Sequence, residues 1–281
     1  MASLHQARVA LLESRRESEL ASLVRRHGGE PICVPALRET ERECDAEAAR
    51  AMDALTAAGD VVVLATGVGL ERWMAVAERL GRARDLRAAL ERSTIVCRGP
   101  KPVAVLKREG LTAHVRAAPP HTTAELLRAL ETVDVRDRPV VFVHDGGALR
   151  AVPDALAGRG ARVFELQPYG WALPDDVEPL RALVRSILAG RVDAVAVTTQ
   201  IQARHLFDVA ESMGEAPGLR EALRERVIVA AVGPTCARAL EGLGAPPHVV
   251  PDQAKMGPLV MALAIHLESS RAARSGSPGE H

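Results

Sequence analysis

The chain has 281 residues, of which 47% are hydrophobic and only 2% aromatic, so it can form two domains with mainly aliphatic cores. Its 36 basic and 36 acidic residues balance, which argues against the broad basic surface of a nucleic-acid-binding protein. The four cysteines form no CxxC pair, and no signal peptide or run of about 18 apolar residues occurs. We therefore expect a reduced, cytoplasmic protein that binds neither nucleic acid nor a membrane.

Short apolar runs alternate with longer helical patterns along the chain. The expected strands are 8–13, 31–35, 61–66, 94–98, 114–117, 140–144, 162–167, 194–199, 228–232 and 248–251. Most are apolar throughout, which is typical of parallel strands covered on both faces. The expected helices between them include 17–26, 103–109, 203–212 and 236–243. This alternation predicts an α/β fold built from parallel βαβ units.

An internal repeat relates the two parts of the sequence. The segment DVVVLAT at 60–66 corresponds to DAVAVTT at 193–199, an offset of 133 residues. At an offset of 134, Gly99-Pro100 matches Gly233-Pro234 and His114 matches His248. Pro35 and Pro168 again differ by 133. Ordered matches at a nearly constant offset predict the duplication of one flavodoxin-like half.

The two halves need not be contiguous in the sequence. We expect one lobe to combine residues 1–36 with 173–266 and the other to comprise 41–167. Segments 36–41 and 167–173 would then be paired crossings between the lobes. The tail, 267–281, is small, polar and contains Gly and Pro, which predicts disorder.

Ligands of open parallel sheets bind beyond the carboxyl ends of the strands. Helix N-termini at this edge offer free N–H groups and partial positive charge. We therefore expect ligand contacts in the turns that follow the strands. The candidate binding residues are Ser14, Arg15, Thr66, Gly67, Val68, Arg98, Gly99, Lys101, His144, Thr198, Thr199, Gln200, Gly233, Pro234 and Thr235.

Each candidate also has a structural interpretation. Thr66 and Thr199 can bind ligand carboxylates or cap the helices that follow them. Arg98 and Lys101 suit carboxylate binding, but they would also suit an ordinary surface turn. Tyr169, the only tyrosine, is either a proton or hydrogen-bond donor or a residue packed at a domain junction with its hydroxyl in water.

Taken in order, six segments resemble the uroporphyrinogen-III synthase family over about residues 8–265. They are RVALLESRRESELASLVRRHGGEPICVPAL, DVVVLATGVGLERW, CRGPKPVAVLKREG, ELQPYGWALP, VDAVAVTTQIQARHLF and VIVAAVGPTCARALEGLGAPPHVVPDQAKMGPLV. The resemblance implies two flavodoxin-like lobes joined by a two-stranded linker, with the active site in the cleft.

The resemblance also implies an activity. The substrate would be hydroxymethylbilane, a linear tetrapyrrole, converted without a metal or organic cofactor. The reaction would remove water, invert ring D through a spiro intermediate and close uroporphyrinogen III, as a cyclising hydro-lyase. Tyr169 lies near the position of the family's proposed proton donor. A monomer in transient contact with hydroxymethylbilane synthase is expected.

Two segments depart from the family pattern. Gln200-Ile201-Gln202 replaces a run of small residues, and His144-Asp145 replaces an arginine-bearing glycine turn. His144 and Asp145 form either an acid/base pair or, since Asp and Gly favour turns, a structural turn. An acidic Asp145 facing a polycarboxylate would be unfavourable. These departures leave open a divergent ligand-binding or regulatory module on the same fold without synthase activity, or another two-lobed small-molecule binder.

Overall fold

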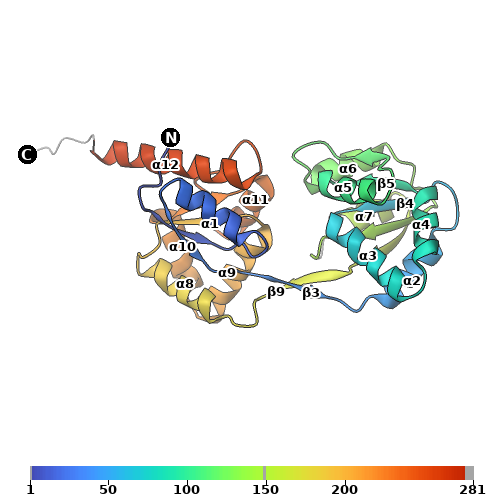
Figure 1. The fold of residues 1–281 in the computed structure, drawn as a ribbon, viewed down its shortest axis with the longest axis horizontal. Coiled ribbons are helices and arrows are strands. Elements are labelled where there is room, and N and C mark those ends of the chain that lie inside the picture. Colours follow the sequence, from blue (N-terminus) through green and yellow to red (C-terminus); the bar gives the residue numbers. More distant parts are fainter. Residues whose placement is uncertain (1, 148–149, 276–281) are drawn as a thin grey trace, which may run out of the picture. The chain divides into compact units, whose positions relative to one another are not determined.

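The computed structural model describes residues 2–147 and 150–275 (Figure 1). The chain divides into two compact units, each with its own cores. Unit 1 comprises Met1–Arg38 and Ala172–His281, and unit 2 comprises Glu39–Trp171. Within the described part of the chain, no helix is long and apolar enough to cross a membrane.

Unit 2 contains a parallel five-stranded sheet in the order β6-β5-β4-β7-β8. Its strands are β4 (Val61–Leu64), β5 (Thr94–Cys97), β6 (Val115–Arg116), β7 (Pro139–Val143) and β8 (Arg162–Leu166). The central strand β4 is buried along its whole length. Burial on both sides explains why this strand is continuously apolar rather than alternating.

Helices cover both faces of this sheet. They are α2 (Asp45–Ala54), α3 (Gly67–Arg79), α4 (Ala83–Arg92), α5 (Pro100–Arg108), α6 (Thr123–Glu131) and α7 (Ala151–Gly158). Val62 and Leu64 of β4 share a core with apolar residues of α2 to α5. Val61 and Val63 face the opposite side and pack with α6 and α7. The alternation follows from the two-residue period of a strand.

Unit 1 contains a parallel sheet in the order β11-β10-β1-β2. Its strands are β1 (Arg8–Leu11), β2 (Glu30–Cys33), β10 (Ala194–Val197) and β11 (Ile228–Ala231). Its helices are α1 (Glu17–Arg26), α8 (Glu178–Leu188), α9 (Gln200–Ser212), α10 (Ala216–Glu225), α11 (Pro234–Gly242) and α12 (Met256–Ser275). One face packs with α8 to α11, and the other packs with α1 and α12.

The two units share one spatial arrangement of strands. A parallel bridge between Ala230 and Val249 extends the unit 1 sheet beyond β11. In chain order, unit 1 therefore reads 2-1-3-4 followed by this bridge, which is the flavodoxin order. Unit 2 has the same arrangement circularly permuted, with β8-β7-β4-β5-β6 in the corresponding places. The predicted duplication of flavodoxin-like parallel-sheet lobes is confirmed.

Matched histidines support this correspondence in atomic detail. The ring Nδ1 of His114 accepts a hydrogen bond from the Ile95 amide of β5 at 3.1 Å. The ring Nδ1 of His248 accepts one from the Val229 amide of β11, also at 3.1 Å. His248 lies 134 residues after His114, and Val229 lies 134 residues after Ile95. The repeat therefore conserves this hydrogen bond, which links β5 or β11 to the segment that pairs with its outer side.

A separate two-stranded sheet joins β3 (Arg38–Glu41) to β9 (Tyr169–Ala172), as the resemblance predicted for the linker. The guanidinium group of Arg72 in α3 binds Glu39 at 3.1 Å and also pairs with Glu41. These ion pairs attach β3 to the body of unit 2.

Two expectations for the C-terminal region are wrong. The predicted disorder from residue 267 onward does not hold as far as Ser275, because α12 continues to that residue. Leu263 and Leu267 are buried on this helix, and its last turns are rich in good helix formers. Residues 276–281 lie outside the described part of the chain. The strand expected at 248–251 is reduced to the bridge at Val249, since Pro247 and Pro251 flank it and cannot donate ladder hydrogen bonds.

Candidate functional site

The topological switch point of unit 2 lies between β4 and β7. Beyond β4 the chain proceeds to β5 and β6 on one side, whereas β7 and β8 extend the sheet on the other. Such a point is the usual ligand-binding position of an open parallel sheet. Thr66 follows β4 here, and Asp145 follows β7.

Thr66 and Tyr169 are brought together at this point. Thr66 caps α3, because its Oγ1 accepts a hydrogen bond from the Gly69 amide at 3.0 Å. The same oxygen lies 3.0 Å from the Tyr169 hydroxyl. Tyr169 is only 1% exposed, and its ring packs edge-on against Trp171 at 5.4 Å. The capping interpretation of Thr66 is therefore confirmed, and the Tyr169 hydroxyl bonds to protein rather than reaching into water.

Two glycines at the start of α3 permit close packing at the sheet edge. A Cβ atom on Gly67 would lie 3.0 Å from the Lys101 carbonyl and from Val105, so α3 and α5 begin side by side. A Cβ atom on Gly69 would lie 2.9 Å from Val143 and 3.0 Å from the His144 carbonyl. The positive ends of two helices consequently meet at this edge, which favours anions.

Arg98 and Asp145 form an ion pair across the same edge. The guanidinium Nη1 lies 2.8 Å from Asp145 Oδ2, and the side chains are 23% and 13% exposed. Asp145 also accepts the Gly147 amide at 3.2 Å through Oδ1, and its carbonyl accepts the Trp171 indole N–H at 3.1 Å. Arg98 therefore has a protein carboxylate as its partner where a ligand carboxylate was expected.

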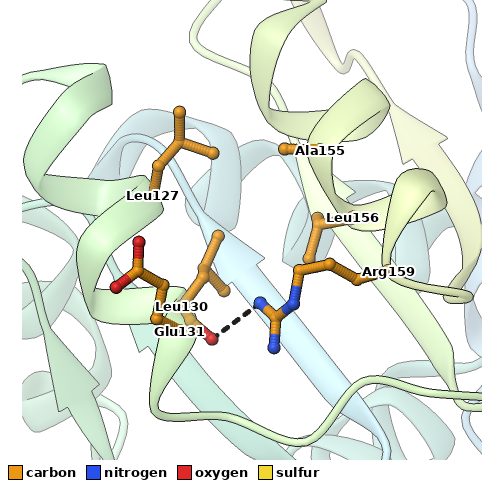
Figure 2. Close-up of a pocket in the computed structure, with 6 residues that line it drawn as sticks. All are labelled: Leu127, Leu130, Glu131, Ala155, Leu156 and Arg159. Atoms are coloured by element: carbon orange, nitrogen blue, oxygen red, sulfur yellow. Dashed lines mark hydrogen bonds between the residues drawn. The ribbon is translucent and has the colours of Figure 1, made fainter.

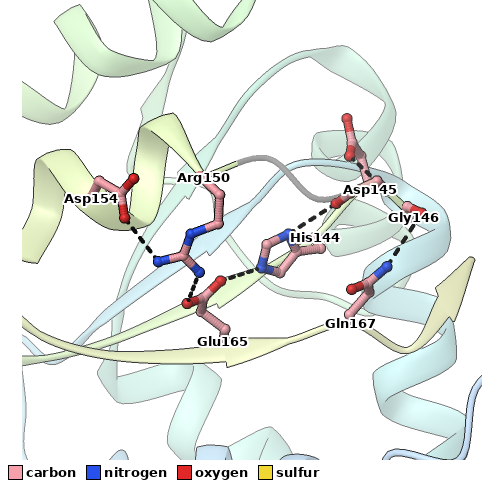
Figure 3. A network of polar contacts seen from close by, with 8 residues as sticks. His144, Asp145, Gly146, Arg150, Asp154, Glu165 and Gln167 are labelled. Atoms are coloured by element: carbon pink, nitrogen blue, oxygen red, sulfur yellow. Dashed lines mark hydrogen bonds and ion pairs between the residues drawn. The ribbon is translucent and has the colours of Figure 1, made fainter.

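Gly146 lies in the turn after β7 (Figure 3), and the close packing of this turn requires a glycine. Its φ of +86° suits glycine. A Cβ atom would also come within 2.6 Å of the Trp171 indole nitrogen and 2.7 Å of the Tyr169 ring. The turn thus packs directly on both aromatic residues.

His144 is buried in unit 2, and its ring lies beside Glu165 (Figure 3). His144 is 3% exposed, and its Nε2 lies 2.9 Å from Glu165 Oε2. The other oxygen of Glu165 accepts a hydrogen bond from Arg150 at 2.6 Å. This geometry matches the structural interpretation of the His-Asp turn, and a contact between His144 and substrate stays a prediction.

The switch point of unit 1 lies between β1 and β10, and Glu13 occupies it. Glu13 Oε1 accepts hydrogen bonds from the amides of Arg15 at 3.1 Å and Arg16 at 3.3 Å. Its Oε2 accepts the Thr198 hydroxyl and the Gln202 side-chain amide. The carboxylate of Glu13 therefore accepts hydrogen bonds from both the loop after β1 and the loop after β10.

The side chain of Gln202 accepts the backbone amides at the start of α9. Its Oε1 accepts the amides of Thr198 at 2.8 Å and Thr199 at 3.2 Å. In return, Thr199 Oγ1 accepts the Gln202 amide at 3.4 Å, which completes a capping box. The capping interpretation of Thr199 is confirmed, and the two threonine amides are already engaged.

The remaining candidates lie at the same edges of their units. In unit 1, Ser14 follows β1, Gln200 begins α9, and Gly233, Pro234 and Thr235 form the start of α11. In unit 2, Val68 lies in the first turn of α3, Gly99 caps α5, and the exposed Lys101 lies in its first turn. The structure thus places the candidates at the carboxyl ends of the two sheets.

Sequence reasoning assigned no structural role to four residues that shape these edges: Glu13, Gln202, Gly146 and Trp171. Gln202 had a readable signal, because Thr199 followed three residues later by Gln is a capping-box pattern. The roles of the other three depend on partners that only the folded chain brings near.

Two cavities lie elsewhere in unit 2. One of about 160 Å³ is lined by Leu127, Leu130, Glu131, Ala155, Leu156 and Arg159 of α6 and α7 and the turn after α7 (Figure 2). Arg159 donates a hydrogen bond to the Leu130 carbonyl across it at 2.9 Å. The other, of about 400 Å³, is bordered by charged residues of β3 and α3. Neither is lined by the candidate residues.

Cys97 and Cys236 are buried and unsuited to act as nucleophiles. Burial raises the pKa of the Cys97 thiol and of the Cys236 thiol to about 12 in each case, so both stay protonated at neutral pH. Among residues 2–147 and 150–275, no group of three or more His, Cys, Asp or Glu side chains could hold a metal ion.

Comparison with known proteins identifies the family of this chain. A family model described as uroporphyrinogen-III synthase HemD matches residues 18–261. A Bacillus subtilis protein named "Uncharacterized protein YjjA" is 32% identical over 266 residues, covering 93% of this chain and 96% of the relative.

Solved structures have the same fold. A mutant uroporphyrinogen III synthase from the extremely thermophilic bacterium Thermus thermophilus superposes with a TM-score of 0.72 at 29% identity, covering 96% of this chain and 99% of that one. The Helicobacter pylori uroporphyrinogen-III synthetase is 11% identical, covers 94% of this chain and 99% of that one, and superposes with a TM-score of 0.54, which shows the fold alone. The duplicated two-unit fold and the family match over most of the sequence together show that this chain belongs to the uroporphyrinogen-III synthase family.

Proposed function

We propose that this protein is a uroporphyrinogen-III synthase that dehydrates and cyclises hydroxymethylbilane with inversion of ring D. The family match over residues 18–261 carries this proposal. The formal reaction is that of a cyclising hydro-lyase. The product is the precursor of the cyclic tetrapyrroles.

The chemistry demands positioning more than strong acid or base catalysis. The pyrroles of the substrate expel the hydroxyl group themselves and give an azafulvene, which then reacts with the far end of the chain. Holding the two ends in the geometry of the spiro intermediate lowers the barrier to the inverted product. Without this control, the substrate closes without inversion.

Donors for the eight substrate carboxylates are available at the strand ends. In unit 2 these are the adjoining starts of α3 and α5, with Arg98 and Lys101 beside them. Helix N-termini and cations both favour bound anions. We assign substrate binding to these groups and to the loops after β1, β10 and β11 in unit 1.

Tyr169 is our candidate for the proton donor to the leaving hydroxyl. Its hydroxyl lies 3.0 Å from Thr66 Oγ1 at the start of α3. Tyr169 is 1% exposed in the structure, so the role requires its hydroxyl to become accessible to the substrate. The alternative is that Tyr169 only holds the cap of α3.

We further propose that the protein acts in the cytoplasm as a monomer and without a cofactor. Hydroxymethylbilane cyclises spontaneously, so direct transfer from hydroxymethylbilane synthase through a transient contact would limit loss to the wrong isomer.

A divergent binding module without synthase activity is the second candidate. One observation favours it: Glu13 and Gln202 engage the donors after β10 within the molecule. A polycarboxylate would have to compete with these contacts in unit 1.

Complementation separates the two candidates. The gene is expressed in a bacterial strain that lacks uroporphyrinogen-III synthase and grows poorly without added haem. A synthase restores growth, whereas a binding module that accumulates as folded protein does not. An empty vector and a known synthase gene provide the controls.

A further inference from the structure

Glu13 and Asp145 are acidic residues in the turns that follow β1 and β7 at the two switch points. Each is the second residue beyond its strand, β1 or β7, at the switch point of its sheet. Each carboxylate also accepts the backbone amide two residues later, from Arg15 at 3.1 Å and from Gly147 at 3.2 Å. Each unit thus has an acidic side chain at its switch point that folds back on the amide two residues later.

The second oxygen of each carboxylate engages a donor from another loop. In unit 1, Glu13 Oε2 accepts a hydrogen bond from the Thr198 hydroxyl and another from the side-chain Nε2 of Gln202 at 3.3 Å. In unit 2 the corresponding oxygen of Asp145 pairs with Arg98 at 2.8 Å. Hydroxyl, amide and guanidinium groups are also the donors that would bind the carboxylate of a ligand.

We propose that Glu13 and Asp145 are built-in competitors for the carboxylate-binding donors of the two units, and that they set the affinity for a polycarboxylate ligand. This inference rests on the proposed function, because it takes the ligand to be a tetrapyrrole with many carboxylates. Substrate carboxylates bind by displacing these side chains or by binding beside them.

Both routes lower the affinity. An intramolecular carboxylate competes at a high effective concentration because the backbone holds it next to its donors. A carboxylate that stays in place repels an incoming anion. A unit charge about 4 Å away in water-like surroundings changes a binding constant about fivefold.

Amide substitutions test the proposal because they remove the charge and keep the shape. Glu13→Gln and Asp145→Asn are compared with the wild type by titrating each with uroporphyrin III, a stable macrocycle with eight carboxylates, and following its fluorescence. We expect each variant to bind about fivefold more tightly, with a gain that shrinks as salt is added. The KM for hydroxymethylbilane should fall in parallel, with a smaller change in kcat.

Glu241→Gln is the matched control, because Glu241 is an exposed carboxylate on α11 away from the strand ends. It removes the same charge and should leave uroporphyrin binding unchanged. Circular dichroism and urea unfolding establish that each variant is folded.

Unchanged or weaker binding by both folded variants would overturn the proposal. Loss of folding in both would also contradict it, because the carboxylates would then be needed by the fold rather than compete with a ligand. If one variant fails to fold, the other decides the outcome.

The proposed function can fail separately from this inference. A wild-type protein that neither binds uroporphyrin nor makes the type III isomer would contradict the function itself. A wild-type protein that makes the type III isomer, with variants that bind no more tightly, would contradict only the role of Glu13 and Asp145.

Discussion

The hydroxyl groups of Tyr169 and Thr66 share one hydrogen bond at the start of α3. Thr66 also accepts the Gly69 amide, so a chemical role for Tyr169 and a structural one predict different results. The two roles can be separated because substitution at either residue breaks this bond, but only one removes the phenol.

We expect Tyr169→Phe to lower kcat at least about tenfold, since positioned proton donors commonly contribute more than this. The lost hydrogen bond should cost about 1 kcal/mol of unfolding free energy, because the ring still fills its buried site. An assay in which hydroxymethylbilane is generated in situ and converted by the protein measures kcat. Urea unfolding measures the free energy of unfolding.

Thr66→Val is the control for the chemical role of Tyr169. It loses the hydrogen bond and the helix cap, at a cost of about 1–2 kcal/mol, but keeps the phenol. If Tyr169 donates the proton, Tyr169→Phe is the slower enzyme and Thr66→Val the less stable one. Wild-type kcat in Tyr169→Phe would remove Tyr169 from the mechanism.

At the residue scale, local interactions were predictable and distant ones were not. The caps at Thr66 and Thr199 follow from residue type and position just before a helix. The pairing of Arg98 with Asp145 joins residues 47 positions apart, and no local pattern encodes it. The burial of His144 against Glu165 likewise depends on β7 and β8 lying side by side.

At the scale of secondary-structure elements, strands β5 and β11 share one feature. Each has an amide completed by a histidine ring, through Ile95 and His114 in unit 2 and through Val229 and His248 in unit 1. Because the ring nitrogen is the acceptor, it lacks a proton in this arrangement.

We expect His114→Ala and His248→Ala each to cost about 1–2 kcal/mol of unfolding free energy, because each leaves a strand amide without its partner. The two costs should be additive, since the sites lie in separate cores. Urea unfolding of the single and double variants measures them.

Asparagine variants at the same positions test the hydrogen bond itself. The side-chain oxygen of Asn takes the place of the histidine Nδ1 and can accept the same amide, so His114→Asn and His248→Asn should recover part of the loss. Equal stability of the alanine variants and the wild type would contradict the assigned role.

Most elements were predictable because their patterns are strong. Short, mostly apolar runs identified nine of the strands, each of which ends one or two residues earlier in the structure than expected. The expected strand at 248–251 was wrong because flanking prolines limit its ladder. The end of α12 was missed because small polar residues resemble a disordered tail, whereas buried Leu263 and Leu267 anchor the helix.

At the scale of the whole molecule, the duplication links sequence, fold and family. The constant offset predicted two similar sheets, and both sheets have the same spatial order of strands. The circular permutation follows from the same matches, because the segment that ends at Pro35 opens one expected lobe whereas its match that ends at Pro168 closes the other. The offset did not predict that the strand ends of the two units differ. Gly69 of unit 2 corresponds to Gln202 of unit 1, whose side chain accepts the amides of Thr198 and Thr199.

The central claim is that this chain directs hydroxymethylbilane to the inverted ring. The most direct test generates hydroxymethylbilane in situ, adds the purified protein, oxidises the products and separates the type I and type III uroporphyrin isomers. Our account predicts a dominant type III product that depends on the concentration of the protein. Only the spontaneous type I isomer, from protein shown to be folded, would contradict it and favour a binding module on the same fold.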